Sequence, residues 1–165
     1  MDDSVQFLSD ITKKVDTPET KDVYVLALME TAKFKLQLNQ FDDVKKAIDE
    51  SEKILDQFDS VETIIYASFY RVSADYYKAK AEYAQYYKSA LLFLACINVD
   101  EISPEERVSR AYDLAIAALL GDMIYNFGEL VSVHGMGKRR VLKEMRKLML
   151  VYVVNASYLG FPLQH

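Results

Sequence analysis

The sequence predicts an all-α protein built as a right-handed helical repeat. Three observations carry this prediction. The 165 residues contain only three Pro and five Gly, so helix breakers are scarce, especially before residue 120. Apolar side chains recur at steps of three and four along the chain, the spacing of one helical face. The pattern around Tyr24 also returns around Tyr66, which indicates stacked copies of one helical unit.

The internal repeat defines the kind of helical stack. We call the separation between Tyr24 and Tyr66 the repeat offset. The pairs that it aligns are Tyr24 and Tyr66, Leu28 and Tyr70, Ala32 and Ala74, Phe34 and Tyr76, Phe41 and Tyr83, and Ala47 and Ser89. A small residue followed by an aromatic that opens the second helix is typical of tetratricopeptide-like hairpins, although their period is shorter, at about 34 residues. The sequence therefore predicts a right-handed tetratricopeptide-like solenoid fragment.

The chain from Met1 to Leu38 predicts two helices. Asp3 or Ser4 can cap the first one, and its expected apolar stripe is Val5, Phe7, Leu8, Ile11 and Val15. Thr17-Pro18-Glu19 combines a cap residue, Pro at the first helical position and an acid in the first turn, which predicts the second helix start. This helix should reach about Leu38, with an apolar stripe of Val23, Leu26, Ala27, Phe34 and Leu38 and with Glu30 as an exposed exception.

A third helix is expected after a break at Asn39-Gln40. It begins at Phe41-Asp42-Asp43, and lysines and acids occupy its outer face. The side chains expected on its inner face are Val44, Ala47, Ile48, Ser51, Ile54, Leu55 and Phe58.

The most distinctive stretch runs from Tyr66 to Val99 and predicts a helical hairpin. Asp59 or Ser60 can cap its first helix, and Lys78 to Ala81 is the expected break. Side chains at 66, 69/70, 73/74 and 77, and again at 83, 87, 90/91 and 94, follow helical spacing. The two helices should therefore share a seam of aromatic and small residues.

A last well-marked helix follows the connector Asp100-Glu101-Ile102. Ser103-Pro104-Glu105-Glu106 is a capping box with Pro at the first helical position, the clearest local start signal in the chain. From Ala111 to Leu120 this helix is apolar on most sides, so we expect it to be buried among neighbours. Gly121-Asp122 should end it, and Met123 to Phe127 should open a short further segment.

Charge and cysteine content exclude several function classes. The net charge is −5, but residues 1–130 carry −10 and residues 131–165 carry +5. An acidic body argues against nucleic acid as a partner. A single cysteine, Cys96, forms no intrachain disulfide and suits a reducing compartment, where we interpret it as an inert buried thiol. The acidic start Met1-Asp2-Asp3 does not resemble a secretion signal.

The sequence contains no pattern that predicts catalysis. His134 and His165 lack partners at metal-ligand spacing, and the acid pairs Asp42-Asp43 and Glu105-Glu106 fit helix starts. Gly135-Met136-Gly137-Lys138 follows no strand, which argues against a phosphate site. The tyrosines could stack on a ligand, but a helical aromatic stripe is more often core or interface. We therefore expect a non-enzymatic protein with no catalytic residue, no cofactor and no metal.

Two motifs resemble a known family. They are Tyr86-Tyr87-Lys88-Ser89-Ala90-Leu91-Leu92-Phe93-Leu94 and Leu119-Leu120-Gly121-Asp122-Met123-Ile124-Tyr125-Asn126-Phe127-Gly128-Glu129-Leu130. Both resemble the 26S proteasome non-ATPase regulatory subunit 13 family, a component of the regulatory-particle lid, and weaker similarity extends over residues 2–85. The resemblance implies a non-catalytic scaffold in ubiquitin-dependent degradation, in cytoplasm and nucleus, with other lid subunits as partners. Its motifs suggest a possible interface at Tyr86, Tyr87, Tyr125, Phe127 and Leu130.

The resemblance also divides the chain. In the family the helical repeats lead into a PCI domain with a winged helix, and members are more than twice as long, so the sequence is interpreted as a truncated form. Residues 1–130 are expected to be a helical-repeat domain, and residues 131–165 a basic and apolar tail outside the family pattern, disordered or forming one helix.

The tail carries the alternative function. Lys138 to Lys147 is basic and amphipathic, and Leu148 to Val154 is apolar but far shorter than the roughly 20 residues that span a bilayer. Such a segment could bind a membrane surface or a calmodulin-like partner, or it could fold back on the acidic body. We expect no membrane contact for the body itself.

Overall fold

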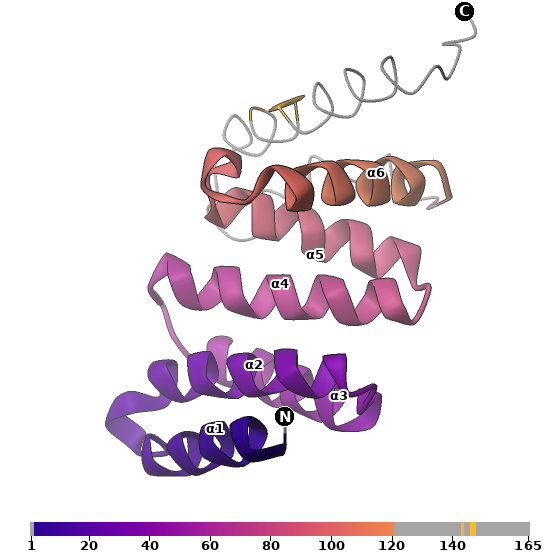
Figure 1. Ribbon diagram of the computed structural model, residues 1–165. Coiled ribbons are helices and arrows are strands. Elements are labelled where there is room, and N and C mark those ends of the chain that lie inside the picture. The colour runs from indigo at the N-terminus through magenta and orange to yellow at the C-terminus, as the bar shows by residue number, and fades with distance from the viewer. Residues whose placement is uncertain (1, 121–142, 144–145, 148–165) are drawn as a thin grey trace, which may run out of the picture. The chain divides into compact units, whose positions relative to one another are not determined.

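The computed structural model describes residues 2–120, 143 and 146–147. Over residues 2–120 it contains only helices and the turns between them, as Figure 1 shows. The α-helices are α1 (Asp2–Lys14), α2 (Lys21–Gln37), α3 (Phe41–Leu55), α4 (Thr63–Ala79), α5 (Tyr83–Cys96) and α6 (Pro104–Leu120). Two short 3-10 helices, η1 (Pro18–Thr20) and η2 (Val99–Glu101), precede α2 and α6. The all-α prediction is confirmed.

The chain forms two compact units that divide between Ala81 and Glu82. In the first unit, α2 packs against α1, α3 and α4, and α3 also contacts α4. In the second unit, α5 packs against α6. The division falls inside the hairpin predicted over residues 66–99, so the shared aromatic seam between its two helices stays a prediction.

The helix bounds follow the repeat offset. The first helix of the repeat, α2, spans Lys21–Gln37, and α4 spans Thr63–Ala79, an identical length at that offset. The second helix starts at Phe41 in α3 and at Tyr83 in α5, one of the residue pairs that the sequence aligned. A further step of the same size leads close to the start of α6 at Pro104. The period of the residues is therefore also the period of the helices.

The turn inside each repeat also recurs at this offset. Asn39 has φ 59° and Ala81 has φ 57°, and these are the non-glycine residues described with positive φ. Each follows the first helix of its repeat and reverses the chain shortly before the second helix starts. Asn tolerates this left-handed conformation, whereas Ala adopts it only at a steric cost.

The cores of α3 and α4 follow the predicted faces in large part, although Ile54, Tyr66 and Tyr77 are only half-buried. The buried α3 side chains are Val44, Ala47, Ile48, Ser51 and Leu55, and those of α4 are Ile65, Phe69, Tyr70, Val72, Ser73, Ala74 and Tyr76. Phe58, predicted on the inner face of α3, lies beyond the helix and is exposed. The first helix of the 66–99 hairpin starts at Thr63 after Glu62, so neither Asp59 nor Ser60 caps it.

The predicted stripes of the first two helices were partly wrong. Phe7 is 64% exposed, because α1 turns the face with the buried Thr12 towards α2, where the Thr12 and Thr31 hydroxyls lie 3.3 Å apart. In α2 the buried apolar residues are Val25, Met29 and Ala32, and the predicted Val23 is exposed. Val25, Met29 and Ala32 follow helical spacing on one face of α2, and this is not the face that the sequence predicted.

The second unit has its core between α5 and α6. Most of α5 from Tyr86 to Cys96 is buried, and α6 contributes Ala111, Leu114 and Ala117. Arg110 lies over the Phe93 ring at 4.8 Å and donates from Nε to Glu106 Oε1 at 2.8 Å. Tyr112 is 52% exposed, so one side of α6 faces solvent, whereas Ala111, Leu114 and Ala117 are buried as expected. Tyr83, predicted in the seam, is also exposed.

The start of α6 confirms its capping prediction. The Ser103 hydroxyl accepts a hydrogen bond from the Glu106 backbone N–H at 3.2 Å. At the other Pro-containing start, the Thr17 hydroxyl instead pairs with the Thr20 hydroxyl at 2.7 Å, and a 3-10 turn precedes α2. The two similar motifs therefore begin their helices differently.

Candidate protein-interaction surface

A shallow groove runs between α2 and α3 in the first unit. Its volume is about 190 Å³. Small and apolar side chains from both helices form part of its lining, and charged side chains form the rest. The lining residues are Leu28, Thr31, Ala32, Lys35, Asp43, Lys46, Ala47 and Glu50. A mixed lining of this kind suits contact with a protein side chain, since apolar area and charged groups are both within reach.

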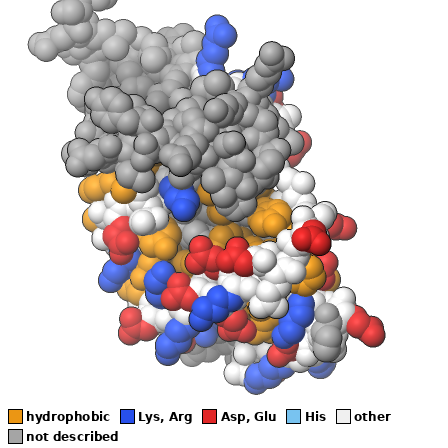
Figure 2. All heavy atoms as spheres, turned by 180° about the vertical axis from the view of Figure 1, so that it is seen from behind, with side chains coloured by type: hydrophobic (Ala, Val, Ile, Leu, Met, Phe, Trp, Pro, Cys, Tyr) orange, Lys and Arg blue, Asp and Glu red, His pale blue; other side chains and the backbone are white. Residues whose placement is uncertain are grey.

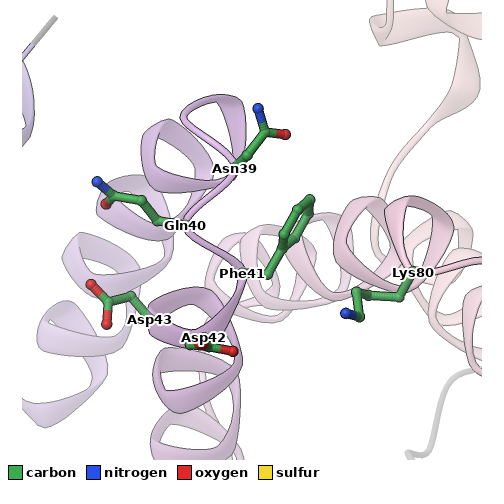
Figure 3. Close-up of a pocket in the computed structure, with 6 residues that line it drawn as sticks. All are labelled: Asn39, Gln40, Phe41, Asp42, Asp43 and Lys80. Atoms are coloured by element: carbon green, nitrogen blue, oxygen red, sulfur yellow. The ribbon is translucent and has the colours of Figure 1, made fainter.

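A wider, open pocket lies at the turn end of the same helices. It has a volume of about 450 Å³ and is lined by Asn39, Gln40, Phe41, Asp42, Asp43 and Lys80 (Figure 3). The turn and the start of α3 supply five of these residues, and Lys80 directly follows the last residue of α4. Asp43 lines both the groove and the pocket, so the two form one surface, which we call the turn-end surface.

Aromatic packing holds the pocket in shape. The Phe41 ring meets the Tyr76 ring edge-on, with 6.4 Å between centroids, and Tyr76 is buried. Lys80 Nζ lies 5.5 Å from the Phe41 ring centroid, a cation–π distance. The first residue of α3 is therefore fixed by α4 and the residue that follows it.

Ion pairs set the charge of the turn-end surface. Lys35 Nζ donates to Asp43 Oδ2 at 3.1 Å, and Lys46 Nζ lies 3.8 Å from Asp43 Oδ1. The hydrogen bond and charge of Lys35, assisted by Lys46, lower the pKa of the Asp43 carboxyl. Asp43 is thus an anion between two cations at neutral pH, and it can only accept hydrogen bonds.

A second polar cluster lies further along α3. Lys45 Nζ donates to Asp49 Oδ1 at 2.8 Å and lies 3.5 Å from the Tyr77 hydroxyl. The hydrogen bond to Asp49 raises the pKa of Lys45. On α2, the Tyr24 hydroxyl donates to Glu50 Oε1 at 2.6 Å, and burial and Glu50 together raise the pKa of Tyr24. These shifts keep both groups protonated, which suits fixed contacts and not proton transfer.

The described surface mixes charges of both signs. Figure 2 shows Asp and Glu side chains next to Lys and Arg side chains, with hydrophobic side chains between them. A partner protein can recognise such a face through complementary charge.

The residues predicted as an interface have different outcomes. Tyr86 and Tyr87 are only 2% and 8% exposed, so both belong to the core around α5, and burial raises the pKa of Tyr87. Tyr125, Phe127 and Leu130 lie outside the described residues. The interface role of all five residues stays a prediction.

The turn-end surface was not predicted from the sequence. Lys46 was expected on the solvated face of α3 and Lys80 in a break between helices, and nothing in the residue pattern brought the two together. The repeat offset could have drawn attention to the turn at Asn39, because it aligns this turn with the one at Ala81.

The described residues provide little for chemistry. They contain no cluster of three or more His, Cys, Asp or Glu side chains that could hold a metal ion. Cys96 is buried and takes part in no disulfide bond within the described residues. None of the helices in this part of the chain has the length and apolar character that crossing a membrane requires.

The repeated helix bounds define a helical-repeat protein. The sequence pattern of the family described as PSD13 N-terminal repeats matches residues 1–151. The chain belongs to this family. The match continues past Leu130, where the resemblance was expected to end, and the division into a 1–130 domain and a 131–165 tail stays a prediction.

Individual relatives agree with the family assignment. The chain is 47% identical over 130 residues to the probable 26S proteasome regulatory subunit rpn9 of Schizosaccharomyces pombe. It is 39% identical over 134 residues to the 26S proteasome non-ATPase regulatory subunit 13 of Dictyostelium discoideum. It is 34% identical over 142 residues to the regulatory subunit RPN9 of Saccharomyces cerevisiae. Each comparison covers 79% of this chain but only 34–36% of the relative, so the chain spans about a third of their length.

Proposed function

We propose that this chain is a non-catalytic scaffold segment of the 26S proteasome regulatory particle, in its lid, and that it serves ubiquitin-dependent degradation through protein–protein contacts. The observation that carries the proposal is the family match over residues 1–151, together with relatives named as regulatory subunits of the 26S proteasome. Its partners are other lid subunits, and its location is the cytoplasm and the nucleus.

The fold supports a role in contact and not in chemistry. Stacked helical units expose long faces on which other proteins can lie, and they place few groups in closed pockets. The turn-end surface combines apolar side chains with Lys35, Asp43 and Lys46. We assign one contact with a lid subunit to this surface.

Affinity purification of the tagged chain from cells, followed by mass spectrometry, tests the proposal. Lid subunits should co-purify with the chain. Lys46→Glu together with Lys80→Glu should reduce their recovery, because both lysines line the turn-end surface. The matched control is Lys53→Glu, which makes one of the same changes on an exposed α3 position that lines neither cavity.

Three outcomes distinguish the parts of the proposal. Recovery of lid subunits that only the Lys46/Lys80 variant loses supports both the function and the surface. Equal recovery of lid subunits with all variants overturns the assignment of the turn-end surface as a contact and leaves the proposed function standing. Absence of every 26S subunit from the purification of a soluble, helical chain overturns the proposal as a whole.

A further inference from the structure

The connector between α5 and α6 gathers cations from two distant parts of the chain. Asp100, in η2, has both carboxylate oxygens engaged. Lys147 Nζ donates to its Oδ2 at 2.6 Å, and Arg107 Nη1 lies 3.8 Å from its Oδ1. Lys147 is far from Asp100 in sequence, so this contact is tertiary and does not arise from local helix spacing.

The same lysine has a second acceptor on the connector. Lys147 Nζ lies 3.2 Å from Asn98 Oδ1, which also accepts the backbone N–H of Asp100 at 3.2 Å. The backbone of this connector is ordered as well, because the Glu101 N–H donates to the Asn98 carbonyl at 2.9 Å. Contacts within the connector itself therefore hold the oxygens that receive Lys147.

The residues described next to Lys147 are basic and helical. Residues 143, 146 and 147 are described as helix and are Lys, Arg and Lys. Lys147, Arg107 and Lys143 each lower the pKa of the Asp100 carboxyl, with Lys147 contributing most. We call Lys143, Arg146 and Lys147 the strap residues.

We propose that the α5–α6 connector is an acidic docking site for a basic helical segment, and that the strap residues of this chain occupy it. The inference goes beyond the proposed function, since it concerns a contact within the second unit. It also gives this basic part of the chain a role on the protein itself, through the pairing of Lys147 with Asp100 of the connector.

A charge-swap cycle with hydrogen exchange on the full chain tests the proposal. Asp100→Lys removes the acceptor and repels Lys147, so amide exchange in a peptide covering residues 143–147 should become about two- to fivefold faster, the scale of an exposed ion pair. Lys147→Asp should have the same effect. The double variant restores an opposite-charge pair and should return the exchange rate towards that of the parent chain.

Matched controls separate this docking contact from general effects. Glu101→Lys makes an identical charge change one residue away, at a side chain that has no ion pair among the described residues, and should leave exchange at 143–147 unchanged. Asp100→Asn removes the charge with little change in shape and serves if the lysine variant unfolds. Raising the salt concentration should accelerate exchange in the parent chain more than in Asp100→Asn, because salt screens the ion pair.

Three results of the charge-swap cycle would overturn the docking proposal. Unchanged exchange at 143–147 in both Asp100 variants, with α5 and α6 still protected, overturns the proposal. So does equal acceleration by Glu101→Lys, and so does a double variant that exchanges as fast as the single variants. Restored protection in the double variant alone supports it.

Discussion

At the scale of single residues, the two left-handed turn residues differ in chemistry. Asn39 and Ala81 occupy equivalent places in the repeat with φ 59° and 57°. Asn reaches this conformation with little cost because its short polar side chain can bond locally, whereas the Ala Cβ approaches the following carbonyl oxygen. Ala81 therefore stores backbone strain that Asn39 does not.

This difference gives the first prediction. Ala81→Gly should raise the free energy of unfolding by up to about 1 kcal/mol, because relief of the Cβ clash exceeds the entropy that glycine adds to the unfolded chain. Asn39→Gly is the control and should change the free energy of unfolding by about a few tenths of a kcal/mol at most. Urea denaturation measures both. A loss of stability in Ala81→Gly would show that this turn is not strained.

The Asp43 carboxyl gives a prediction about pH. Its pKa is lowered chiefly by Lys35, so Asp43 adds stability that is present above the ordinary carboxyl pKa and is lost as the pH falls through the lowered value. Lys35→Gln should move the pKa of Asp43 upwards. Lys46→Gln should raise this pKa less, because Lys46 Nζ lies 3.8 Å from the Asp43 carboxylate whereas Lys35 Nζ lies 3.1 Å from it. Carboxyl NMR titration of the variants checks this order. An unchanged titration in Lys35→Gln would refute the ion pair.

At the scale of helices, the two Pro-containing start motifs provide a matched pair. Ser103 caps α6 through the Glu106 N–H, whereas the Thr17 hydroxyl is engaged with Thr20 and caps no backbone group. Ser103→Ala should destabilise the protein by about 1 kcal/mol, the usual loss for an N-cap. Thr17→Ala should lower the stability by less than Ser103→Ala does, because the Thr17 hydroxyl caps no backbone group. Thermal unfolding measures the stability of both variants. A larger loss in Thr17→Ala than in Ser103→Ala would contradict the assignment of Ser103 as the cap.

The repeated small residues predict a packing effect. Ala32 and Ala74 occupy the same repeat position and are 1% and 0% exposed, so neither site has room for a larger side chain. Ala74→Leu should cost about 1–3 kcal/mol through overpacking. Ala79→Leu is the control, because Ala79 is exposed in the last turn of α4. If both leucines were tolerated equally in denaturation experiments, the close approach of helices at Ala74 would be disproved.

Prediction from sequence succeeded for elements whose signals are local. The cap at Ser103, the break expected between Lys78 and Ala81 and most of the inner face of α3 depend on neighbouring residues. The structure agrees with these predictions, with α4 ending at Ala79 and Phe58 as the exposed exception. Prediction failed in part for α2, where packing against three helices buries Val25, Met29 and Ala32 and leaves the predicted Val23 exposed. The turn-end surface was missed because it needs Lys80 beside Phe41, a tertiary contact that the chain order does not contain.

At the scale of the whole molecule, one period links the sequence and the helices. The repeat offset that relates Ala32 to Ala74 recurs in the bounds of α2 and α4 and in their left-handed turns. The family matched over residues 1–151 is itself described as repeats. Repeated helical units of this kind present extended faces on which other proteins can bind, and this is the basis of the proposed function.

The central claim is that these repeats act by contact within the 26S regulatory particle. Its most direct test is binding of the purified chain to a lid prepared without its PSD13-family subunit, followed by sedimentation. We predict that the chain sediments with the lid, that an excess of the full-length relative displaces it, and that Lys46→Glu with Lys80→Glu weakens it while Lys53→Glu does not. A folded, helical chain that stays in the unbound fraction at every lid concentration would contradict the account.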